Sequence, residues 1–461
     1  MPARDVAGGF WPTCHLLRRK RSLYDLAGAA SLSDTLLGTT TRAGPGWFLL
    51  SRVDNAEKHF MRSRTWASEK DRQSALPFPA LPQTRPERLK IGYFSADFHD
   101  HATMFLIAGL LREHDRAGFE LFAYSYGRIR SGDWRKRAEG DVDHFFDVAD
   151  SSDRDVADLA RSHGLDIAVD LKGYTEDARS GIFRHRPAPV QINFLGYPGS
   201  MGADFIDYIV ADPTIIPDDQ RRFYSERIIY LPHSYQPNDN TREIAKTDTT
   251  RADFGLPEDG FVFCCFNNNY KIGPCEFDVW MRLLDKVDGS VLWLFRSNIW
   301  AEYNLRKEAE KRGVDPARLV FAGKLPHPEH LARHKHADLF IDTFNCNAHT
   351  TASDALWGGL PVVTKQGKQF AARVAASLLR AVRLPELIAE TEEEYEKRIL
   401  ELASAPDKLS SIKTRLAENR MKEPLFDTWR YTRNFEHGLR QAYDLYFEGK
   451  PPEDIWVKEP E

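Results

Sequence analysis

From residue 88 onward, short apolar runs alternate with longer segments of helical periodicity. The first half of this region contains five runs of strand length, separated by segments such as Met104–Glu113 and Asp153–His163 that read as helices or loops. Alternation of this kind predicts a mostly parallel sheet with helices covering both of its faces. The predicted strands are Leu89–Phe94, Phe119–Tyr126, His144–Val148, Ile167–Leu171 and Val190–Leu195.

The same alternation begins again after residue 250. The second set of predicted strands is Phe261–Phe266, Val291–Phe295, Leu319–Phe321, Leu339–Asp342 and Pro361–Thr364. Its predicted helices include Glu276–Lys286, Tyr303–Arg312, Glu329–Lys335, Ala352–Trp357 and Ala371–Leu379. Two consecutive cycles predict an α/β protein with two Rossmann-like domains that face one another.

The ends of the chain follow a different pattern. Residues 1–85 contain helical fragments at Leu16–Leu26 and Ala56–Ser68 and a Pro-rich linker, so we expect a small helical extension. Helical periodicity returns at Glu392–Ser404 and Thr428–Tyr446, and the polar tail Gly449–Glu461 is expected to fray. The predicted divisions are therefore 1–85 (extension and linker), 86–245 (first Rossmann-like domain), 246–425 (second Rossmann-like domain) and 426–461 (helix and tail).

Composition narrows the class of protein. The chain has 461 residues and 42% hydrophobic content, which is more than one core needs. A net charge of -5 gives no support to nucleic-acid binding. The five cysteines lack CxxC spacing and suggest neither a zinc site nor a disulfide framework, which fits a reducing cytoplasm. No run of ~18 apolar residues is present, so membrane spanning is not expected.

Candidate chemistry lies where predicted strands end. After the strand that ends at Asp342, Thr350 and Thr351 open a helix whose free N–H groups and dipole favour an anion. Asp354, one turn further, is placed to accept hydrogen bonds from sugar hydroxyls. An ordinary Thr-capped helix explains the same pattern when it is read alone. The other strand ends carry Ser95–Thr103, Gly173–Thr175 with Arg179, Leu195–Ser200 and Asn267–Lys271.

The sequence favours a ligand that needs no metal. His99 and His101 lack a third ligand, and the DxD pattern Asp141-Val142-Asp143 precedes a strand where a metal-binding motif should follow one. No GxGxxG follows a strand and no GxxxxGK[ST] is present, so dinucleotide redox and P-loop chemistry lose support. A lysine, a helix N-terminus and a hydroxyl acceptor suit a nucleoside diphosphate, and a His/Asp pair suits an acceptor. The combination predicts a metal-independent glycosyltransferase.

From about Arg88 to about Tyr431, the chain resembles the catalytic region of the O-linked N-acetylglucosamine transferase family, glycosyltransferase family 41. The order and spacing of the matching motifs agree over most of the chain. These motifs are Gly92–Phe98, Gly173–Thr175, Arg186–Gln191, Leu195–Gly199, Asp207–Asp212, Phe266-Asn267, Tyr270–Ile272, His349–Thr351 and Asp354–Trp357.

The resemblance implies a GT-B architecture and transfer of N-acetylglucosamine from UDP-N-acetylglucosamine to protein Ser or Thr with inversion. It implies no metal or other cofactor and no nucleic-acid or membrane partner. Lys271 would contact the diphosphate and be a catalytic residue, Thr350 and Thr351 would contact the phosphate, and Asp354 would contact the ribose. Further residues implied around the nucleotide sugar are Asn268, His327, His330, Arg333 and His349. On the opposing domain the resemblance implies catalytic roles for Asp97 and His101 and an acceptor side with Thr103, Thr175, Arg179, Leu195, Gly196 and Pro198.

Departures from the family pattern leave alternatives open. Asn268 stands where the family usually has Gln, His327 where animal members have a lysine beside the uracil, and Ala102 where a Pro follows the catalytic histidine. Residues 1–85 hold at most a remnant of the family's tetratricopeptide array, so the acceptor stays open. One alternative is a GDP-fucose-dependent protein O-fucosyltransferase, which Asn267-Asn268 favours and His349 does not. The other is a catalytically weak regulatory protein that binds nucleotide sugars.

Overall fold

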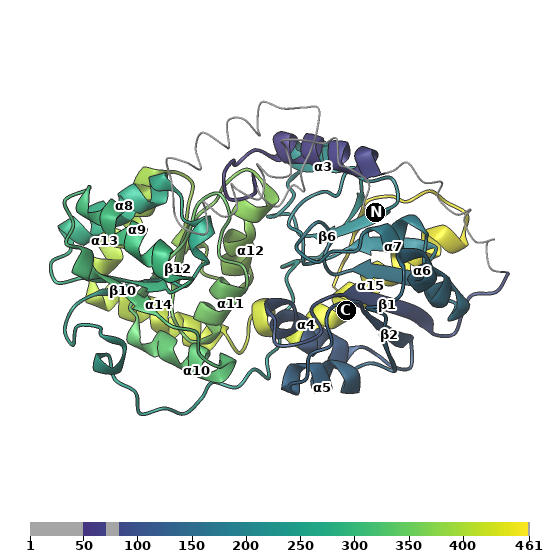
Figure 1. Ribbon diagram of the computed structural model, residues 1–461, viewed down its shortest axis with the longest axis horizontal. Coiled ribbons are helices and arrows are strands. Elements are labelled where there is room, and N and C mark those ends of the chain that lie inside the picture. The colour runs from purple at the N-terminus through teal and green to yellow at the C-terminus, as the bar shows by residue number, and fades with distance from the viewer. Residues whose placement is uncertain (1–48, 71–82, 460–461) are drawn as a thin grey trace, which may run out of the picture. The chain divides into compact units, whose positions relative to one another are not determined.

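The structure is a computed structural model that describes residues 49–70 and 83–459. Within these residues the chain divides into two compact units. Unit 1 comprises residues 49–55 and Arg242–Glu423, and unit 2 comprises Ala56–Thr241 and residues 424–459. Each unit has its own sheet (Figure 1). The predicted helical fragment at 16–26 and the Pro-rich linker lie outside the described residues.

Unit 2 is built on an eight-stranded sheet whose neighbouring strands all pair in parallel. Its spatial order is β3-β2-β1-β4-β5-β6-β7-β14. Every residue of β4, β5 and β6 is buried, as expected for parallel strands covered on both faces. The strands are β1 Leu89–Ser95, β2 Phe119–Ser125, β3 His144–Asp147, β4 Ile167–Asp170, β5 Val190–Asn193, β6 Tyr208–Ala211, β7 Arg227–Tyr230 and β14 Ile455–Trp456.

Two helices from distant parts of the chain pack together against this sheet. Helix α4 (Ala102–Glu113) buries Leu106, Ile107 and Leu110 in the same core as Phe435 and Leu439 of α15. Helix α15 (Thr428–Phe447, yellow) lies beside α4 in Figure 1. The remaining helices of the unit are α3 Ala56–Lys70, α5 Asp133–Gly140, α6 Asp153–Ser162, α7 Gly181–Arg184, η2 Asp218–Phe223 and η9 Pro424–Phe426.

Unit 1 is built on a six-stranded sheet, again with parallel pairs throughout, in the order β10-β9-β8-β11-β12-β13. Counted from its own first strand, this is the Rossmann order 3-2-1-4-5-6. The strands are β8 Val262–Cys265, β9 Val291–Phe295, β10 Leu319–Ala322, β11 Leu339–Ile341, β12 Val362–Lys365 and β13 Ile388–Ala389. The α-helices are α8 Pro274–Lys286, α9 Ile299–Glu310, α10 His327–Ala332, α11 Thr350–Trp357, α12 Val374–Ala381, α13 Glu392–Ser404 and α14 Pro406–Asn419. Short 3-10 turns are η3 Ala252–Phe254, η4 Asn269–Lys271, η5 Pro316–Arg318, η6 Arg333–His336, η7 Phe370–Ala372 and η8 Pro385–Leu387.

Each sheet has one point at which the strand order reverses. In unit 2 this switch point lies between β1 and β4, and in unit 1 it lies between β8 and β11. The carboxyl ends of parallel strands meet at one edge of a sheet, and the loops at a switch point diverge to leave a crevice there. Ligands of open α/β sheets bind in this crevice. The two switch points are therefore the places at which to look for function.

The two predicted parallel sheets are confirmed, and the ten predicted strands correspond to β1–β5 and β8–β12. Helix α3 confirms the helical fragment predicted at residues 56–68. The prediction of a frayed C-terminal tail is wrong at residues 455–456, because β14 pairs with β7 and the Trp456 ring stacks on Tyr230 with centroids 4.0 Å apart. Residues 424–459 belong to unit 2, whereas the sequence predicted residues 426–461 as a separate helix and tail.

Candidate functional site

The switch point of unit 1 is organised by a buried carboxylate at the end of β11. Asp342 Oδ1 accepts hydrogen bonds from the Ala348 backbone (2.7 Å), the Thr343 backbone (2.8 Å) and Asn267 Nδ2 (3.1 Å). Its Oδ2 accepts one from Thr364 Oγ1 at 2.8 Å. Burial raises the pKa of Asp342 to about 6. The carboxylate thus joins the turns that follow β8 and β11 to strand β12.

Lys271 ends the short turn η4 that follows β8. Its Nζ donates a hydrogen bond to the Asn347 carbonyl at 2.8 Å, and among the described residues no carboxylate lies within ion-pair distance of it. Burial alone would lower the pKa of Lys271, but the acidic groups around it, Cys346 foremost and Asp342 among them, raise this pKa above its usual value. Lys271 therefore presents a positive charge that a bound anion could neutralise.

The first turn of α11 lies at the same switch point. The backbone N–H groups of Thr350 and Thr351 donate to no acceptor in the described part of the chain, and neither does the Thr350 hydroxyl. The Thr351 hydroxyl donates to Asn267 Oδ1 at 2.5 Å, which ties the helix start to the end of β8. Free N–H groups at a helix start bind phosphate groups well. Together with Lys271, which follows β8 at the same switch point, these groups could bind an anion.

His349 precedes α11 and is held as a neutral imidazole. Its Nε2 donates to the Ala371 carbonyl at 3.1 Å. Burial, with a further contribution from the charge of Lys271, lowers the pKa of His349 to about 3. His349 therefore adds no positive charge at neutral pH, and its orientation is fixed by the backbone of η7.

Asp354, the predicted ribose ligand, is buried among cationic and imidazole groups. Its Oδ1 lies 2.6 Å from Arg242 Nη1 and 3.5 Å from His327 Nε2, and its Oδ2 lies 3.8 Å from His330 Nε2. Burial alone would raise the pKa of Asp354, but the hydrogen bond from His327 and the charge of Arg242 hold it well below its usual range. Arg242 was not singled out in the sequence.

Two further predicted nucleotide contacts differ in exposure. Asn268 is exposed on the turn after β8, where its Oδ1 accepts from Ser297 Oγ at 3.5 Å. Arg333 is buried, with its guanidinium carbon 4.3 Å from the centre of the Phe266 ring. Its Nη1 donates to the Gly323 carbonyl at 2.7 Å, and burial lowers its pKa to about 10. In this structure Arg333 braces the end of β8 and the loop after β10.

The switch point of unit 2 brings together Asp97 and His101, which follow β1, and Lys172, which follows β4. Lys172 Nζ donates to Asp97 Oδ2 at 2.7 Å, and both side chains are buried. His101 Nδ1 lies 3.4 Å from the same oxygen, and Thr103 Oγ1 donates to it at 3.4 Å. The sequence predicted Asp97, His101 and Thr103 for this site and missed Lys172.

The turn after β4 is ordered by Asp170. Its Oδ1 accepts from the backbone N–H groups of Lys172 (2.9 Å) and Gly173 (3.0 Å), and burial raises its pKa to about 6. Thr175 donates through its hydroxyl to the Lys172 carbonyl at 2.8 Å and so closes the same turn. Thr175 therefore lies at the switch point, as the sequence predicted from the strand end.

Arg179 is directed elsewhere in the structure. Its guanidinium donates to Asp153 Oδ1 (2.7 Å) and to the carbonyls of Ser151 (2.6 Å) and Val148 (3.2 Å). These partners belong to the loop between β3 and α6 and to the first residue of α6. The structure thus gives Arg179 a role in holding that loop.

The turn after β5 carries the other predicted acceptor-side residues, Leu195, Gly196 and Pro198. Leu195 has a φ of 72°, which an L-residue adopts only under constraint from its surroundings. A Cβ atom on Gly196 would lie 2.0 Å from the Leu171 carbonyl oxygen, so this position requires glycine. The β5 turn therefore packs directly on the β4 turn at the same edge of the sheet.

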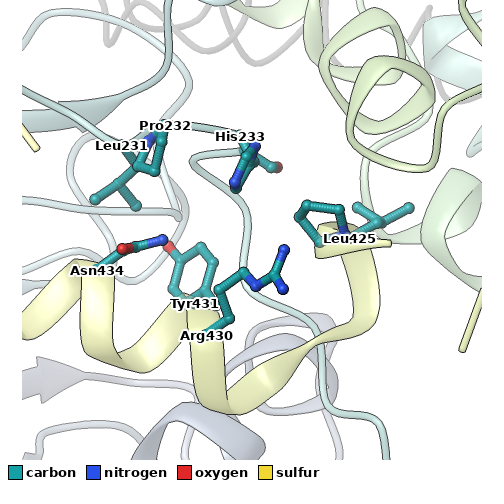
Figure 2. Close-up of a pocket in the computed structure, with 9 residues that line it drawn as sticks. Leu231, Pro232, His233, Leu425, Arg430, Tyr431 and Asn434 are labelled. Carbon is teal, nitrogen blue, oxygen red and sulfur yellow. The ribbon is translucent and has the colours of Figure 1, made fainter. Parts of the chain in front are cut away.

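Two hollows in unit 2 contain none of the predicted site residues. One, of about 10 Å³, lies between the loop after β7 and α15 and is lined by Pro232, His233, Arg430 and Tyr431 (Figure 2). This volume corresponds to about one water molecule. The other, of about 140 Å³, lies at the amino ends of β5 and β6, on the opposite edge of the sheet from the switch point. The strand-end geometry is therefore the better guide to the site.

In the described part of the chain, no three His, Cys, Asp or Glu side chains are grouped as metal ligands. Across residues 49–70 and 83–459, no helix combines the length and the apolar character that a membrane crossing requires.

Two parallel α/β units, each with polar and charged side chains gathered at its switch point, define the GT-B class of glycosyltransferase fold. The chain belongs to glycosyl transferase family 41, whose model matches residues 71–247 and 241–435.

Individual relatives agree with this assignment. The chain is 36% identical over 379 residues to an Arabidopsis thaliana protein named probable UDP-N-acetylglucosamine–peptide N-acetylglucosaminyltransferase SEC, a match that covers 81% of the chain and 39% of the relative. It is 28% identical to the Caenorhabditis elegans UDP-N-acetylglucosamine–peptide N-acetylglucosaminyltransferase, over 80% of the chain and 42% of the relative. The chain thus spans about two fifths of the length of these curated relatives.

A solved structure agrees over most of the length of both chains. A mutant of the Thermobaculum terrenum O-GlcNAc transferase superposes with a TM-score of 0.82 and 27% identity. This match covers 95% of the chain and 83% of the solved chain. The agreement extends the likeness to both units of the fold.

Proposed function

We propose that this protein is an inverting, metal-independent glycosyltransferase that moves N-acetylglucosamine from UDP-N-acetylglucosamine to Ser or Thr hydroxyls of proteins. One observation carries the proposal: Lys271 has no carboxylate partner among the described residues and lies at the same switch point as the open start of α11. A diphosphate leaving group develops negative charge as the sugar departs, and a fixed cation with oriented N–H groups stabilises that charge without a metal ion.

The proposal gives the residues of unit 1 separate tasks. Lys271 neutralises the diphosphate. Thr350 binds phosphate oxygens through its N–H and hydroxyl groups, and Thr351 binds them through its N–H, because its hydroxyl already donates to Asn267. Asp354 accepts from the ribose hydroxyls with the lone pairs that Arg242 leaves open. The remaining nucleotide-side residues, Asn268, His327, His330, Arg333 and His349, shape the pocket or hold its walls.

In unit 2 the proposal assigns the acceptor. Asp97 and His101 lie at the edge where the acceptor hydroxyl reacts, and Thr103, Thr175, Leu195, Gly196 and Pro198 form the surrounding surface. Arg179 acts indirectly, by holding the loop between β3 and α6. The named activities of the family relatives support a nucleotide-sugar donor and a peptide acceptor for this chain. We place the reaction in the cytoplasm, consistent with the absence of a CxxC pattern among the five cysteines.

The donor is the least constrained part of the proposal. His327 is buried beside Asp354, where animal family members have a lysine, and this substitution keeps GDP-fucose as a second candidate donor. A histidine at this position offers a ring and one N–H in place of an ammonium group, so it recognises a base differently.

The test is to incubate the purified protein with each donor in the presence of host proteins and a chelator. We expect faster release of UDP from UDP-N-acetylglucosamine than of GDP from GDP-fucose, and a mass increase of one N-acetylhexosamine on a defined protein. Faster turnover of GDP-fucose would overturn the donor. Binding of UDP with no turnover of either donor would favour the regulatory alternative, and loss of transfer on chelation would overturn metal independence.

A further inference from the structure

The carboxylate of Asp97 forms an ion pair with Lys172, a residue that has no assigned part in the proposed reaction. Lys172 Nζ lies 2.7 Å from Asp97 Oδ2, and the two side chains are 7% and 9% exposed. The Asp170 carboxylate positions the lysine by accepting from its backbone N–H at 2.9 Å. Such a buried pair is a fixed part of the site, because breaking it would leave an uncompensated charge.

The hydrogen bonds around His101 assign its tautomer. His101 is the N-cap of α4, and its Nδ1 accepts from the Thr103 backbone N–H at 3.2 Å. The Thr103 hydroxyl oxygen lies 3.1 Å from the same nitrogen and 3.4 Å from Asp97 Oδ2, so its one proton points between these two acceptors. A backbone N–H can only donate, so Nδ1 presents a lone pair and the proton of the neutral ring is on Nε2. The His101 side chain is 41% exposed, so the ring is accessible to a substrate from one side.

The two observations are linked through one oxygen atom. His101 Nδ1 lies 3.4 Å from Asp97 Oδ2, the same atom that Lys172 holds at 2.7 Å. In a catalytic dyad the carboxylate would accept a hydrogen bond from Nδ1–H and leave the lone pair of Nε2 free to act as a base. Here the lysine takes the stronger position on that oxygen, and the backbone of Thr103 donates to Nδ1.

We propose that Lys172 is a positioning residue: by holding Asp97 in a buried ion pair, it keeps the His101 proton on Nε2, so that His101 meets an oxygen of the substrate as a hydrogen-bond donor. This inference rests on the proposed function, in which His101 lies in the active site. It implies that His101 in this state is not the base that accepts the proton of the acceptor hydroxyl.

The charges around His101 shift its pKa in opposite directions. Burial lowers the pKa of His101, Asp97 raises it, and Lys172, His99 and Arg130 lower it. Replacing Lys172 by an uncharged residue removes the largest of the charges that lower the His101 pKa and leaves Asp97 without its ion-pair partner. The His101 pKa should then rise, and Asp97 should draw the ring proton to Nδ1.

The experiment measures the tautomer directly, by the ¹⁵N chemical shifts of the His101 ring in the full-length protein without substrate. We expect an unprotonated Nδ1 in the parent and in Lys172→Arg, and a protonated Nδ1 in Lys172→Met. The double variant Asp97→Asn with Lys172→Met, which carries no buried charge at either position, should return the proton to Nε2. Lys136→Met, a change at an exposed lysine of unit 2, is the control for losing a lysine.

Sugar transfer gives an independent readout. In Lys172→Met we expect the rate to fall roughly tenfold or more and the acid limb of the pH–rate profile to move to higher pH, while Lys172→Arg retains most of the activity. A protonated Nδ1 in the parent, or an unprotonated Nδ1 in Lys172→Met, would overturn the inference. A parent with the expected tautomer but no transfer would instead contradict the proposed function, so the two failures are distinguishable.

Discussion

The β8–β11 switch point of unit 1 and the β1–β4 switch point of unit 2 share one structural device. Asp342 follows β11 and Asp170 ends β4, the strands on the corresponding side of each switch point. Each carboxylate is fully buried and accepts from backbone N–H groups of the turn that follows. Burial raises the pKa of each to about 6. In both units, therefore, a buried aspartate orders the loop that carries the functional side chains.

The lysines beside these aspartates differ. Lys172 in unit 2 is neutralised by Asp97, whereas Lys271 in unit 1 donates only to the Asn347 carbonyl among its described neighbours. Unit 1 therefore offers an uncompensated cation, which suits a diphosphate. Unit 2 offers an internally balanced set of charges, which suits a neutral hydroxyl acceptor. The two switch points thus share one architecture but suit different ligands, because the lysine of unit 2 is paired with a carboxylate and the lysine of unit 1 is not.

The largest expected effect comes from removing the carboxylate of each buried pair. Asp354→Asn removes the carboxylate that pairs with the buried Arg242 and should lower the free energy of unfolding by about 3–5 kcal/mol. Asp97→Asn makes the same change beside Lys172 and should cost less, because a buried lysine can lose its proton and an arginine cannot. Urea unfolding of both variants measures the difference. An equal or larger loss for Asp97→Asn would contradict this account.

The second effect tests whether the unpaired lysine acts on the leaving group. Lys271→Ala should lower the rate of sugar transfer by about 10²- to 10³-fold, as expected for loss of a group that stabilises developing negative charge. Lys311→Ala, at an exposed lysine of the same unit, is the matched control and should leave the rate unchanged. Steady-state kinetics with UDP-N-acetylglucosamine provide the measurement. Parent-like transfer by Lys271→Ala would remove the functional contrast between the two lysines.

The strand pattern predicted most of this fold because each long strand carries its own apolar run. Sequence reasoning missed β6 and β7, which at four residues each are no shorter than the predicted β4 and β5, and it missed the two-residue strands β13 and β14. Such elements are stabilised by their neighbours in the sheet more than by their own pattern. The C-terminal β14 in particular depends on β7, which lies more than 200 residues earlier in the chain.

Sequence reasoning found the candidate site residues that directly follow a predicted strand, because their position alone marks them as possible ligand contacts. Lys271, Thr350 and Thr351 follow buried strands, and a strand end at a switch point is a recognised place for ligands. Lys172 follows a strand in the same way and could have been found by the same argument. Arg242 could not, because its partner Asp354 lies 112 positions away and nothing in the local sequence marks the pair.

The third effect concerns stability in acid, where we expect unit 1 to lose more free energy of unfolding than unit 2. Burial lowers the pKa of His334 to about 4, so the folded protein keeps this ring neutral while the unfolded chain protonates it below about pH 6.5. The stability contributed by the neutral ring is therefore lost as the pH falls from 6.5 to about 4. This one group accounts for about 3 kcal/mol, from about 1.4 kcal/mol per pH unit.

His334→Gln should remove that part of the pH dependence, measured as the change in unfolding free energy between pH 7 and pH 4.5. His437→Gln, which replaces an exposed histidine of α15 in unit 2, is the control and should leave the slope unchanged. If His334→Gln keeps the full pH dependence of the parent, the buried imidazole is not its source.

The smallest expected effect separates the two switch points with one matched pair of substitutions. Thr351→Val removes the hydroxyl that donates to Asn267 at 2.5 Å, and Thr103→Val removes the one that donates to Asp97 at 3.4 Å. Each change preserves side-chain shape and should cost about 0.5–1.5 kcal/mol. Because Thr351 lies on the anion side, its loss should weaken UDP binding by about 3- to 10-fold, measured by calorimetry. Thr103→Val should leave UDP binding unchanged and lower only the transfer rate. Weaker UDP binding in Thr103→Val would show that the donor and acceptor roles are not divided between the units as proposed.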